Sequence, residues 1–318
     1  MVSFALRRLA QAVPTVFLST VAVFLLLRVL PGDPAQVLAG PDAPRESVEA
    51  IRDSLGLDQP LPIQYVVWLG RVVRGDLGIS ILSRIPVAQL IGQRLPATLE
   101  LTTAAMLLTI AAGLPLGIFA ALHPRGWTSW LVSSFSAVAL ALPNFWLGIL
   151  AIILFSLVLG WLPPGGRVDF ARDAGQALRS LALPSITLSL LPIAALSRLA
   201  RASMLEVLHE DYIRTAQAKG VGRTGVVIRH ALRNALIPIV TILALLFGRL
   251  LGGAVVVESV FAWPGVGTLL LTAIGNRDYA IVQSALLLLV MAVLVVNLLT
   301  DLTYGLLDPR TRSRSGTA

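Results

Sequence analysis

The sequence predicts an all-α polytopic membrane protein with six transmembrane helices. Of its 318 residues, 56% are hydrophobic and only 13% are charged, whereas soluble domains carry about 25% charged residues. The mean hydropathy is +0.82, and apolar residues gather in runs close to the ~20 residues that cross a bilayer as a helix. The positive charges cluster in the loops between these runs. The net charge of +8 therefore reflects membrane orientation, and we expect lipid rather than nucleic acid around this chain.

Hydropathy windows place the six spans along the chain. We expect them at Leu9–Leu30, Ala97–Leu122, Trp130–Leu162, Leu183–Met204, Ala235–Val257 and Ala280–Leu306. The first run follows Arg7 and Arg8 like a signal peptide, but at about 33 Å as a helix it is long enough to be a retained span. The third run is too long for one straight crossing and contains Pro143 and Asn144. It is either one tilted or kinked span, or two short ones that would make seven.

The distribution of positive charge favours six spans. The loop at 205–234 is rich in Lys and Arg, and the tail adds Arg310, Arg312 and Arg314, whereas the loop from Phe261 to Tyr279 carries only Arg277. Short basic loops lie on the cytoplasmic side. With six spans, the N-terminus, the 205–234 loop and the tail are all cytoplasmic. With seven, the 205–234 loop would lie outside.

Four regions follow from this order. They are a cytoplasmic N-terminus with the first span at 1–30, an extracytoplasmic loop region at 31–96, a transmembrane core at 97–306 and a cytoplasmic tail at 307–318. Within the loop region, Arg45–Leu55 and Pro62–Val73 have amphipathic helical patterns. We expect these two helices to form a small cap on the outer membrane face.

The most polar helical pattern is "EDYIRTAQAKGVGRTGVVIRHALRNALIP", from Glu210 to Pro238. Asp211 near the start and Lys219 at the end of its first helical run both suit the helix dipole. Gly220 follows where a left-handed C-cap residue is wanted. The pattern predicts a short, separate helix at Asp211–Lys219 that lies across the cytoplasmic ends of two spans. It is either a docking element for a partner or an ordinary interfacial helix.

Several chemistries are not expected in this chain. Gly220, Gly222 and Gly225 match G-x-G-x-x-G, but a polar helix precedes them where a dinucleotide site needs an apolar strand. The single lysine, Lys219, is followed by glycine, so the chain has no Walker A motif and any ATP must be hydrolysed by another chain. There is no cysteine, and the three histidines have no metal-site spacing. We therefore expect no catalytic residue, metal or cofactor here.

The polar loop resembles that of the membrane-spanning subunits of binding-protein-dependent ABC importers, in particular the dipeptide/oligopeptide/nickel permease group. The general family pattern is Glu-Ala-Ala-x3-Gly-x9-Ile-x-Leu-Pro, of which this chain keeps Ala216, Gly220 and Leu232. It departs from that pattern at Arg214, Thr215, His230 and Arg233. These departures are similar to the variant that the peptide subgroup favours. Further similar stretches are "PGDPA" at 31–35, "GDLGIS" at 75–80, "RLPATLEL" at 94–101 and "VVESVFAWPGVG" at 256–267, so the resemblance covers nearly the whole chain.

The resemblance implies a pore-forming permease subunit that imports di- or oligopeptides by alternating access, in the plasma membrane of a bacterium or archaeon. Nickel, glutathione or another small solute are the alternatives within the family. The implied partners are a second permease subunit, two cytoplasmic ABC ATPases that bind ATP and Mg²⁺, and an extracytoplasmic substrate-binding protein. The implied ATPase-coupling residues are Asp211, Arg214, Ala216, Lys219, Gly220 and Leu232.

Three polar residues in or beside the spans are candidates for the translocation pathway. Arg249 lies in the fifth span, where burying a charge costs free energy unless the charge is paired or hydrated. Glu258 lies nine residues further on, on roughly the opposite helix face, and Asn144 lies in the third run.

Two other classes of membrane protein are the alternatives to an importer subunit. A secondary transporter would show inverted repeats and intramembrane acids for ion coupling, which are not evident in this sequence. An intramembrane enzyme would need paired acids or a nucleophile, and the last span offers only Asn297 and Asp301 on one face.

Overall fold

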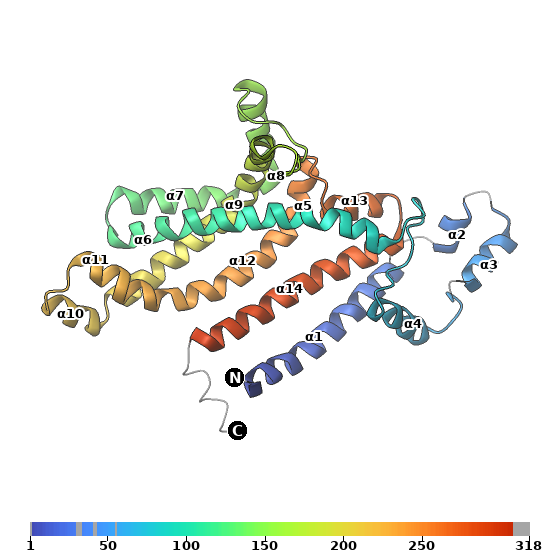
Figure 1. Cartoon of the computed structure of the whole chain (residues 1–318), viewed down its shortest axis with the longest axis horizontal. Helices are drawn as coiled ribbons and strands as arrows, with labels where there is room; N and C mark the ends of the chain where they lie inside the picture. Colours follow the sequence, from blue (N-terminus) through green and yellow to red (C-terminus); the bar gives the residue numbers. More distant parts are fainter. Residues whose placement is uncertain (1, 30–33, 41–42, 55, 308–318) are drawn as a thin grey trace.

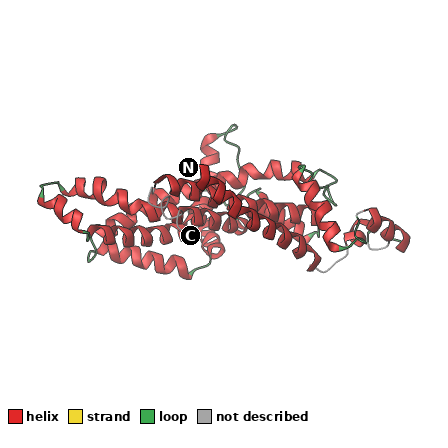
Figure 2. Cartoon of the chain, turned by 90° about the horizontal axis from the view of Figure 1, so that it is seen from below, coloured by secondary structure: helices red, strands yellow, loops and turns green. Residues whose placement is uncertain are grey.

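The computed structural model describes residues 2–29, 34–40, 43–54 and 56–307. In these ranges the chain is a bundle of long helices, and its only β pairing is a bridge between Ile79 and Pro86 (Figures 1 and 2). The all-α prediction is therefore confirmed. The expected tail at 307–318 lies outside the described residues apart from Leu307.

Five helical stretches in the described ranges are long and apolar enough to cross a membrane, and a sixth crossing is present if one bent pair counts as a single span. The helices that supply them are α1 (Val2–Val29), α5 with α6 (Val87–Leu108, Leu114–Leu122), the bent pair α7 and α8 (Trp127–Ala141, Asn144–Ala151), α9 (Ala174–Leu208), α12 (Arg233–Val260) and α14 (Tyr279–Leu307). Each predicted span falls on one of these. The second and fourth begin earlier in the chain than hydropathy alone indicated, because their outer turns are more polar.

The third span is broken rather than gently kinked. Helices α7 and α8, with the π-helical continuation η2 (Ile152–Val158), meet at an angle of 103°. Leu142 has φ −103° and ψ 134°, an extended conformation. The ring of Pro143 disfavours the helical conformation for the residue before it, so α7 ends at Ala141. The expectation of a single tilted or kinked helix over Trp130–Leu162 is corrected to two helices joined at an abrupt corner.

Small residues set the contact between α6 and α9. A side chain at Gly117 would place its Cβ 2.5 Å from the backbone oxygen of Ser197 and 2.6 Å from the Cβ of Ala200. Gly248 and Gly252 of α12 have the same four-residue spacing as Gly113 and Gly117 but are less crowded, because Gly248 faces Val293 and Gly252 has open space. The pair Gly113 and Gly117 therefore brings two helix backbones together, as such spacing favours in membranes.

A π-helical turn, η1 (Thr109–Gly113), separates α5 from α6. Pro115 follows it, near the start of α6. Proline lacks an N–H and its ring crowds the carbonyl four residues earlier, here within η1. The widened turn accommodates that missing hydrogen bond without ending the helical rod.

The loop region after α1 contains short helices, which we call the cap. It holds α2 (Pro34–Ala39), α3 (Arg45–Ser54) and α4 (Leu61–Val73); α3 and α4 match the two predicted patterns, whereas α2 was not predicted. Tyr65 and Trp68 of α4 pack in an aromatic cluster with Phe17 and Phe24 of α1. A hydrogen bond of 2.8 Å joins the hydroxyls of Thr20 and Tyr65. The cap is thus anchored to the first span by α4.

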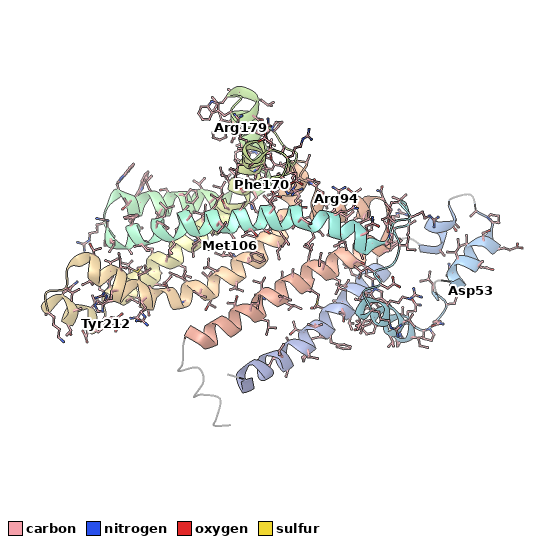
Figure 3. The ribbon with its side chains drawn as sticks, in the orientation of Figure 1. Asp53, Arg94, Met106, Phe170, Arg179 and Tyr212 are labelled. Carbon is pink, nitrogen blue, oxygen red and sulfur yellow. The ribbon has the colours of Figure 1, made fainter. Side chains whose placement is uncertain are left out.

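The helix order separates two ends of the molecule. The beginning of α1, the end of α14, the α6–α7 turn and the short helix α10 (Asp211–Ala218) lie toward one end, and α2, α3 and α4 lie toward the other (Figure 1). Figure 3 places Tyr212 of α10 and Asp53 of α3 at these opposite ends. This is the arrangement that six alternating spans predict.

Candidate functional site

The short helix predicted in the polar loop is present. Helix α10 runs from Asp211 to Ala218, with Lys219 as its C-cap. Gly220 has φ +82°, which confirms the left-handed residue expected after the helix. The N–H of Gly220 donates to the carbonyl of Gln217 at 2.9 Å, and the N–H of Val221 donates to the carbonyl of Ala216 at 3.1 Å. This pair of bonds is a Schellman motif, which needs glycine-like freedom at Gly220.

One face of α10 is packed against the chain itself. Ile213 is 0% exposed and Ala216 is 9% exposed. Ile213 belongs to the hydrophobic cluster beneath the loop, in which the residues are Ala121, Met204, Ile213, Val226, Ala231 and Ala235. Ala216 follows Ile213 by three residues and so lies on the same face of the helix. Leu232 packs against the same cluster. Of the implied coupling residues, Ala216 therefore lies on the buried face of α10 in this chain, where its small side chain lets the helix lie close to its own bundle.

The opposite face of α10 is exposed and polar. Arg214 approaches Asp211 at 3.4 Å, and both side chains are well exposed, so this pair adds little stability. Lys219 is also exposed. The side-chain amide of Asn234 donates to the hydroxyl of Tyr212 at 2.7 Å and so ties α10 to the first turn of α12. The result is a helix whose position is fixed by its buried face while its polar face is free to contact another chain.

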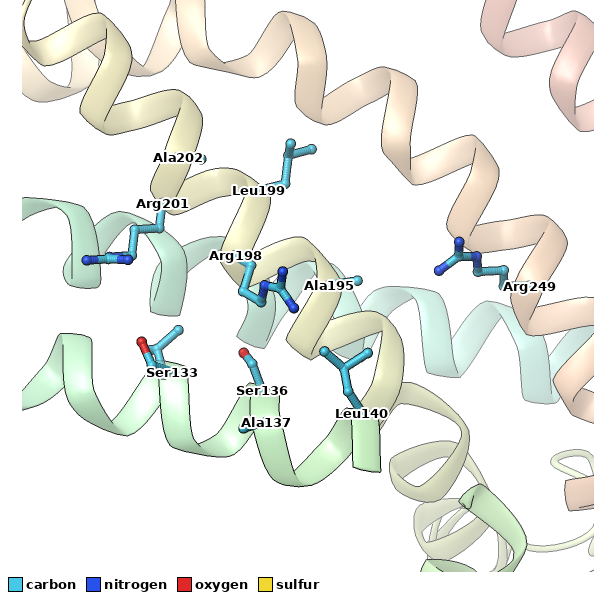
Figure 4. Close-up of a pocket in the computed structure, with 11 residues that line it drawn as sticks. Ser133, Ser136, Ala137, Leu140, Ala195, Arg198, Leu199, Arg201, Ala202 and Arg249 are labelled. Carbon is cyan, nitrogen blue, oxygen red and sulfur yellow. The ribbon is translucent and has the colours of Figure 1, made fainter. Parts of the chain in front are cut away.

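Arg249 borders a hollow that sequence reasoning did not anticipate. The hollow has a volume of about 670 Å³ and opens between α7, α9 and α12. Arg198 and Arg201 of α9 line it together with Arg249 of α12 (Figure 4). Ser133 and Ser136 of α7 also face it. The two α9 arginines were not among the predicted pathway residues. Their spacing of three residues, which puts them on one helix face, was the available signal.

Glu258 is in a different environment from Arg249. It is 0% exposed. The hydroxyl of Thr98 donates to its Oε1 at 2.6 Å, and the N–H of Thr268 donates to its Oε2 at 3.0 Å. The N–H of Val266 donates in turn to the Thr98 hydroxyl at 2.8 Å. This Glu258 clamp joins α5, the end of α12 and the start of α13 (Val266–Gly275), a geometry that favours a structural role over the expected place in the pathway.

Several residues of the motif "VVESVFAWPGVG" at 256–267 form or surround the Glu258 clamp. Trp263 is 0% exposed, and its indole N–H donates to the carbonyl of Ala97 at 2.8 Å. A side chain at Gly265 would overlap the Glu258 carboxylate. The remaining pathway candidate, Asn144, is half-buried as the first residue of α8, directly after the corner at Pro143.

Asp278 is a second buried acid, and it holds the loop before α5 in place by hydrogen bonds. It was not identified from the sequence. Asp278 is 1% exposed. It accepts hydrogen bonds from the Ser80 hydroxyl at 2.6 Å and the Ile81 N–H at 3.0 Å. The motif "GDLGIS" is thereby held against the turn before α14. Because the partners are nearly 200 residues apart in sequence, no local pattern reports this contact.

Comparisons with known proteins agree with these features. The sequence profile described as "Binding-protein-dependent transport system inner membrane component" matches residues 113–313. The corresponding N-terminal profile matches residues 1–102. Among solved structures, the chain is similar to one in the inward facing MetNI methionine ABC transporter, with a TM-score of 0.56 and 19% identity over 69% of this chain and 97% of the other. That similarity concerns the fold.

Curated relatives match over almost the full length. A "Putative peptide transport system permease protein" of Brucella abortus is 44% identical over 98% of this chain and 99% of its own. The "Probable peptide ABC transporter permease protein y4tP" of Sinorhizobium fredii is 42% identical over 97% of this chain and 99% of its own. The "Glutathione transport system permease protein GsiC" of Escherichia coli K12 is 43% identical over 98% and 99%. With family profiles on both parts of the chain and relatives of this identity, the protein belongs to the inner membrane components of binding-protein-dependent transport systems.

Proposed function

We propose that this chain is the pore-forming permease of an ATP-driven importer of short peptides, coupled to cytoplasmic ATPases through α10. The observation that carries the coupling role is the two-sided character of that helix: Ile213 and Ala216 seat it on the bundle, and its other face is polar and exposed. A helix held in this way transmits a push from a partner to α9 and α12, because it moves with them as one rigid element.

The proposed partners are those of an importer complex. They are a second permease subunit, two ABC ATPases that bind ATP and Mg²⁺, and a substrate-binding protein on the outer side of the plasma membrane. The absence of a Walker A motif in this sequence supports hydrolysis by separate subunits. Closure of the ATPases would then drive alternating access through α10. The exposed coupling residues are Asp211, Arg214 and Lys219, whereas Ala216, Gly220 and Leu232 hold the helix in position.

Short peptides are the substrate class that the relatives support best. Those named as peptide permeases are 44% and 42% identical to this chain. A relative named as a glutathione permease is 43% identical, which makes glutathione, itself a modified tripeptide, the second candidate. Identification by mass spectrometry of the ligand carried by the cognate binding protein separates the two.

The coupling proposal is tested by a pair of glycine variants. Gly220→Val puts a branched side chain at φ +82° and strains the Schellman motif, at a cost of about 1 kcal/mol or more. Gly222→Val is the matched control, because Gly222 has open space around it and no left-handed backbone. Both glycines lie outside the spans, so membrane insertion should stay normal.

The readouts are co-purification of the ATPases and peptide-stimulated ATP hydrolysis in vesicles that contain the complete transporter. Gly220→Val should lower both while the variant remains in the membrane at the normal level. Gly222→Val should behave like the wild type. Equal behaviour of the two variants would mean that the geometry of α10 does not govern coupling.

A further inference from the structure

The hollow beside Arg249 concentrates positive charge inside the membrane-spanning bundle. Arg198, Arg201 and Arg249 line it from two helices, and the guanidinium of Arg249 extends toward the side on which Arg198 lies (Figure 4). Arg249 is at the middle of the span Pro238–Val260. Its side chain is exposed in the single chain, and a lipid-facing charge at that depth costs several kcal/mol. The assembled transporter must therefore cover this surface with protein or water.

The arginines of the hollow have no carboxylate partner in the part of the chain that the structure describes. Among the residues that the structure describes, no ion pair joins any of these arginines to a carboxylate. The Nε atom of Arg201 is buried without a hydrogen-bond partner. Arg198 and Arg201 are three residues apart on α9, where like charges repel each other. Three unpaired cations around one opening create a positive potential there, and that potential attracts an anion.

The depth of Arg249 decides which anion fits. A phospholipid headgroup at the membrane surface can reach Arg198 or Arg201, but Arg249 lies about 16 Å from either end of its span. A solute that crosses the bilayer through this hollow would pass all three side chains. Guanidinium groups bind carboxylates by paired, charge-assisted hydrogen bonds, and the hydroxyl of Ser133 adds a further polar contact on the α7 wall.

We propose that the hollow lined by Arg198, Arg201 and Arg249 is an anion-binding part of the translocation path that favours acidic short peptides. The inference rests on the proposed importer function and narrows its substrate class. The carboxylates of the peptide meet Arg249 near the middle of the bilayer and then Arg198 and Arg201 closer to the α10 end. Three weak binding positions of this kind lower the free-energy barrier to crossing the membrane without trapping the solute.

The local potential is measured first, independently of transport. Leu140 lines the hollow on α7 and is exposed, and the native chain has no cysteine. In Leu140→Cys permease, assembled with its partner subunits in nanodiscs of neutral phosphatidylcholine, an anionic methanethiosulfonate should react faster than a cationic one. Arg249→Gln or Arg198→Gln should lower the ratio of the anionic to the cationic reaction rate roughly threefold to tenfold. Arg→Lys at the same positions should preserve it.

Arg172→Gln is the matched control, because it removes an exposed arginine of the outer loop. It should leave the ratio unchanged. A ratio near one in the wild-type background would mean that a carboxylate of a partner subunit already neutralises the arginines, and the proposal would be wrong.

Protection experiments identify the anion. Ala-Glu carries two carboxylates, and the amide of Ala-Gln has nearly the same shape with none. Ala-Glu should slow the labelling of Leu140→Cys by about fivefold or more, the Ala-Gln amide should not, and Arg249→Gln should abolish the difference. Equal protection by both peptides would overturn the proposal. So would protection that appears only when phosphatidylglycerol replaces phosphatidylcholine, because the anion would then be a lipid headgroup.

Uptake of the same two peptides, with their binding protein present, separates failure of this inference from failure of the proposed function. An importer that takes up both peptides equally, with labelling insensitive to either, retains its function and loses the anion site. A complete transporter that takes up no peptide at all contradicts the importer proposal, whatever the labelling shows.

Discussion

At the residue scale, the two charged candidates of the fifth span have opposite environments. Arg249 faces an open hollow, whereas the carboxylate of Glu258 is enclosed by donors from α5 and α13. The sequence identifies both as unusual, because charges are rare in apolar helices. It does not reveal which way each side chain points relative to neighbours that lie far away in sequence. Thr98, for example, is 160 residues from Glu258.

Removing the Glu258 carboxylate should damage folding before it damages transport. Glu258→Ala leaves the hydroxyl of Thr98 and the N–H of Thr268 without their acceptor. Buried donors left unpaired cost about 1–3 kcal/mol each, so we expect a lower unfolding temperature in detergent and less permease in the membrane. Glu258→Gln keeps an acceptor oxygen and should be milder in both respects.

The measurement is a thermal unfolding scan of the purified permease complex, together with peptide uptake normalised to the amount of permease. If Glu258 instead contacts the passing solute, Glu258→Gln will lose most of its uptake at an unchanged unfolding temperature. That result would return Glu258 to the translocation pathway.

At the element scale, α10 illustrates that a sequence predicts the ends of a short helix but does not predict which of its faces is buried. Its start, its end and its cap follow from Asp211, Lys219 and Gly220, because helix dipole and backbone preferences are local. Which alanine faces inward is not local. Ala216 and Ala218 are both small, and only the position of the cluster around Met204 and Ile213 decides that Ala216 is buried and Ala218 is exposed.

Tryptophan at these two positions should therefore produce different defects. Ala216→Trp cannot be accommodated between α10 and the cluster beneath it, so it should displace the helix and make the loop more sensitive to protease. Ala218→Trp keeps α10 in place and adds bulk to its exposed face, so it should weaken ATPase binding while proteolysis stays as in the wild type.

Limited proteolysis of inverted membrane vesicles and co-purification of the ATPases measure the two effects separately. Loss of ATPase binding with normal protease resistance in Ala216→Trp would contradict the inward orientation. Normal ATPase binding in Ala218→Trp would indicate that the partner contacts another part of the loop.

At the scale of the whole molecule, hydropathy predicted the crossings well and the interruptions poorly. The apolar runs correspond to α1, α5 with α6, α9, α12 and α14, because a bilayer imposes length and composition on any helix that crosses it. The corner at Leu142–Pro143 was foreseen only as a kink, since proline signals a break without giving its angle. Helices α2 and α13 were missed because, at 6 and 10 residues, they are far shorter than a span, although α13 is apolar.

The number of crossings depends on the bent pair, and the cysteine-free chain offers a direct test. If α7 and α8 together make one span, single cysteines at Arg125 and Asp169 should be labelled from opposite sides, because these exposed residues lie on either side of the pair. If the pair instead enters and leaves by the same face, both positions will be labelled from one side. The loop containing α10 would then fall outside.

Cysteines at Gln217 and Asp58 complete the map. Both positions are exposed; Gln217 lies on α10, and Asp58 lies in the cap region between α3 and α4. Six spans place Gln217 and Arg125 on the cytoplasmic side, and Asp58 and Asp169 outside. An impermeant maleimide added to intact cells should therefore label only the latter two, and in inverted vesicles only the former two. Labelling of Gln217 in intact cells would place α10 out of reach of any cytoplasmic ATPase, and the coupling role proposed for it would fail together with the six-span arrangement.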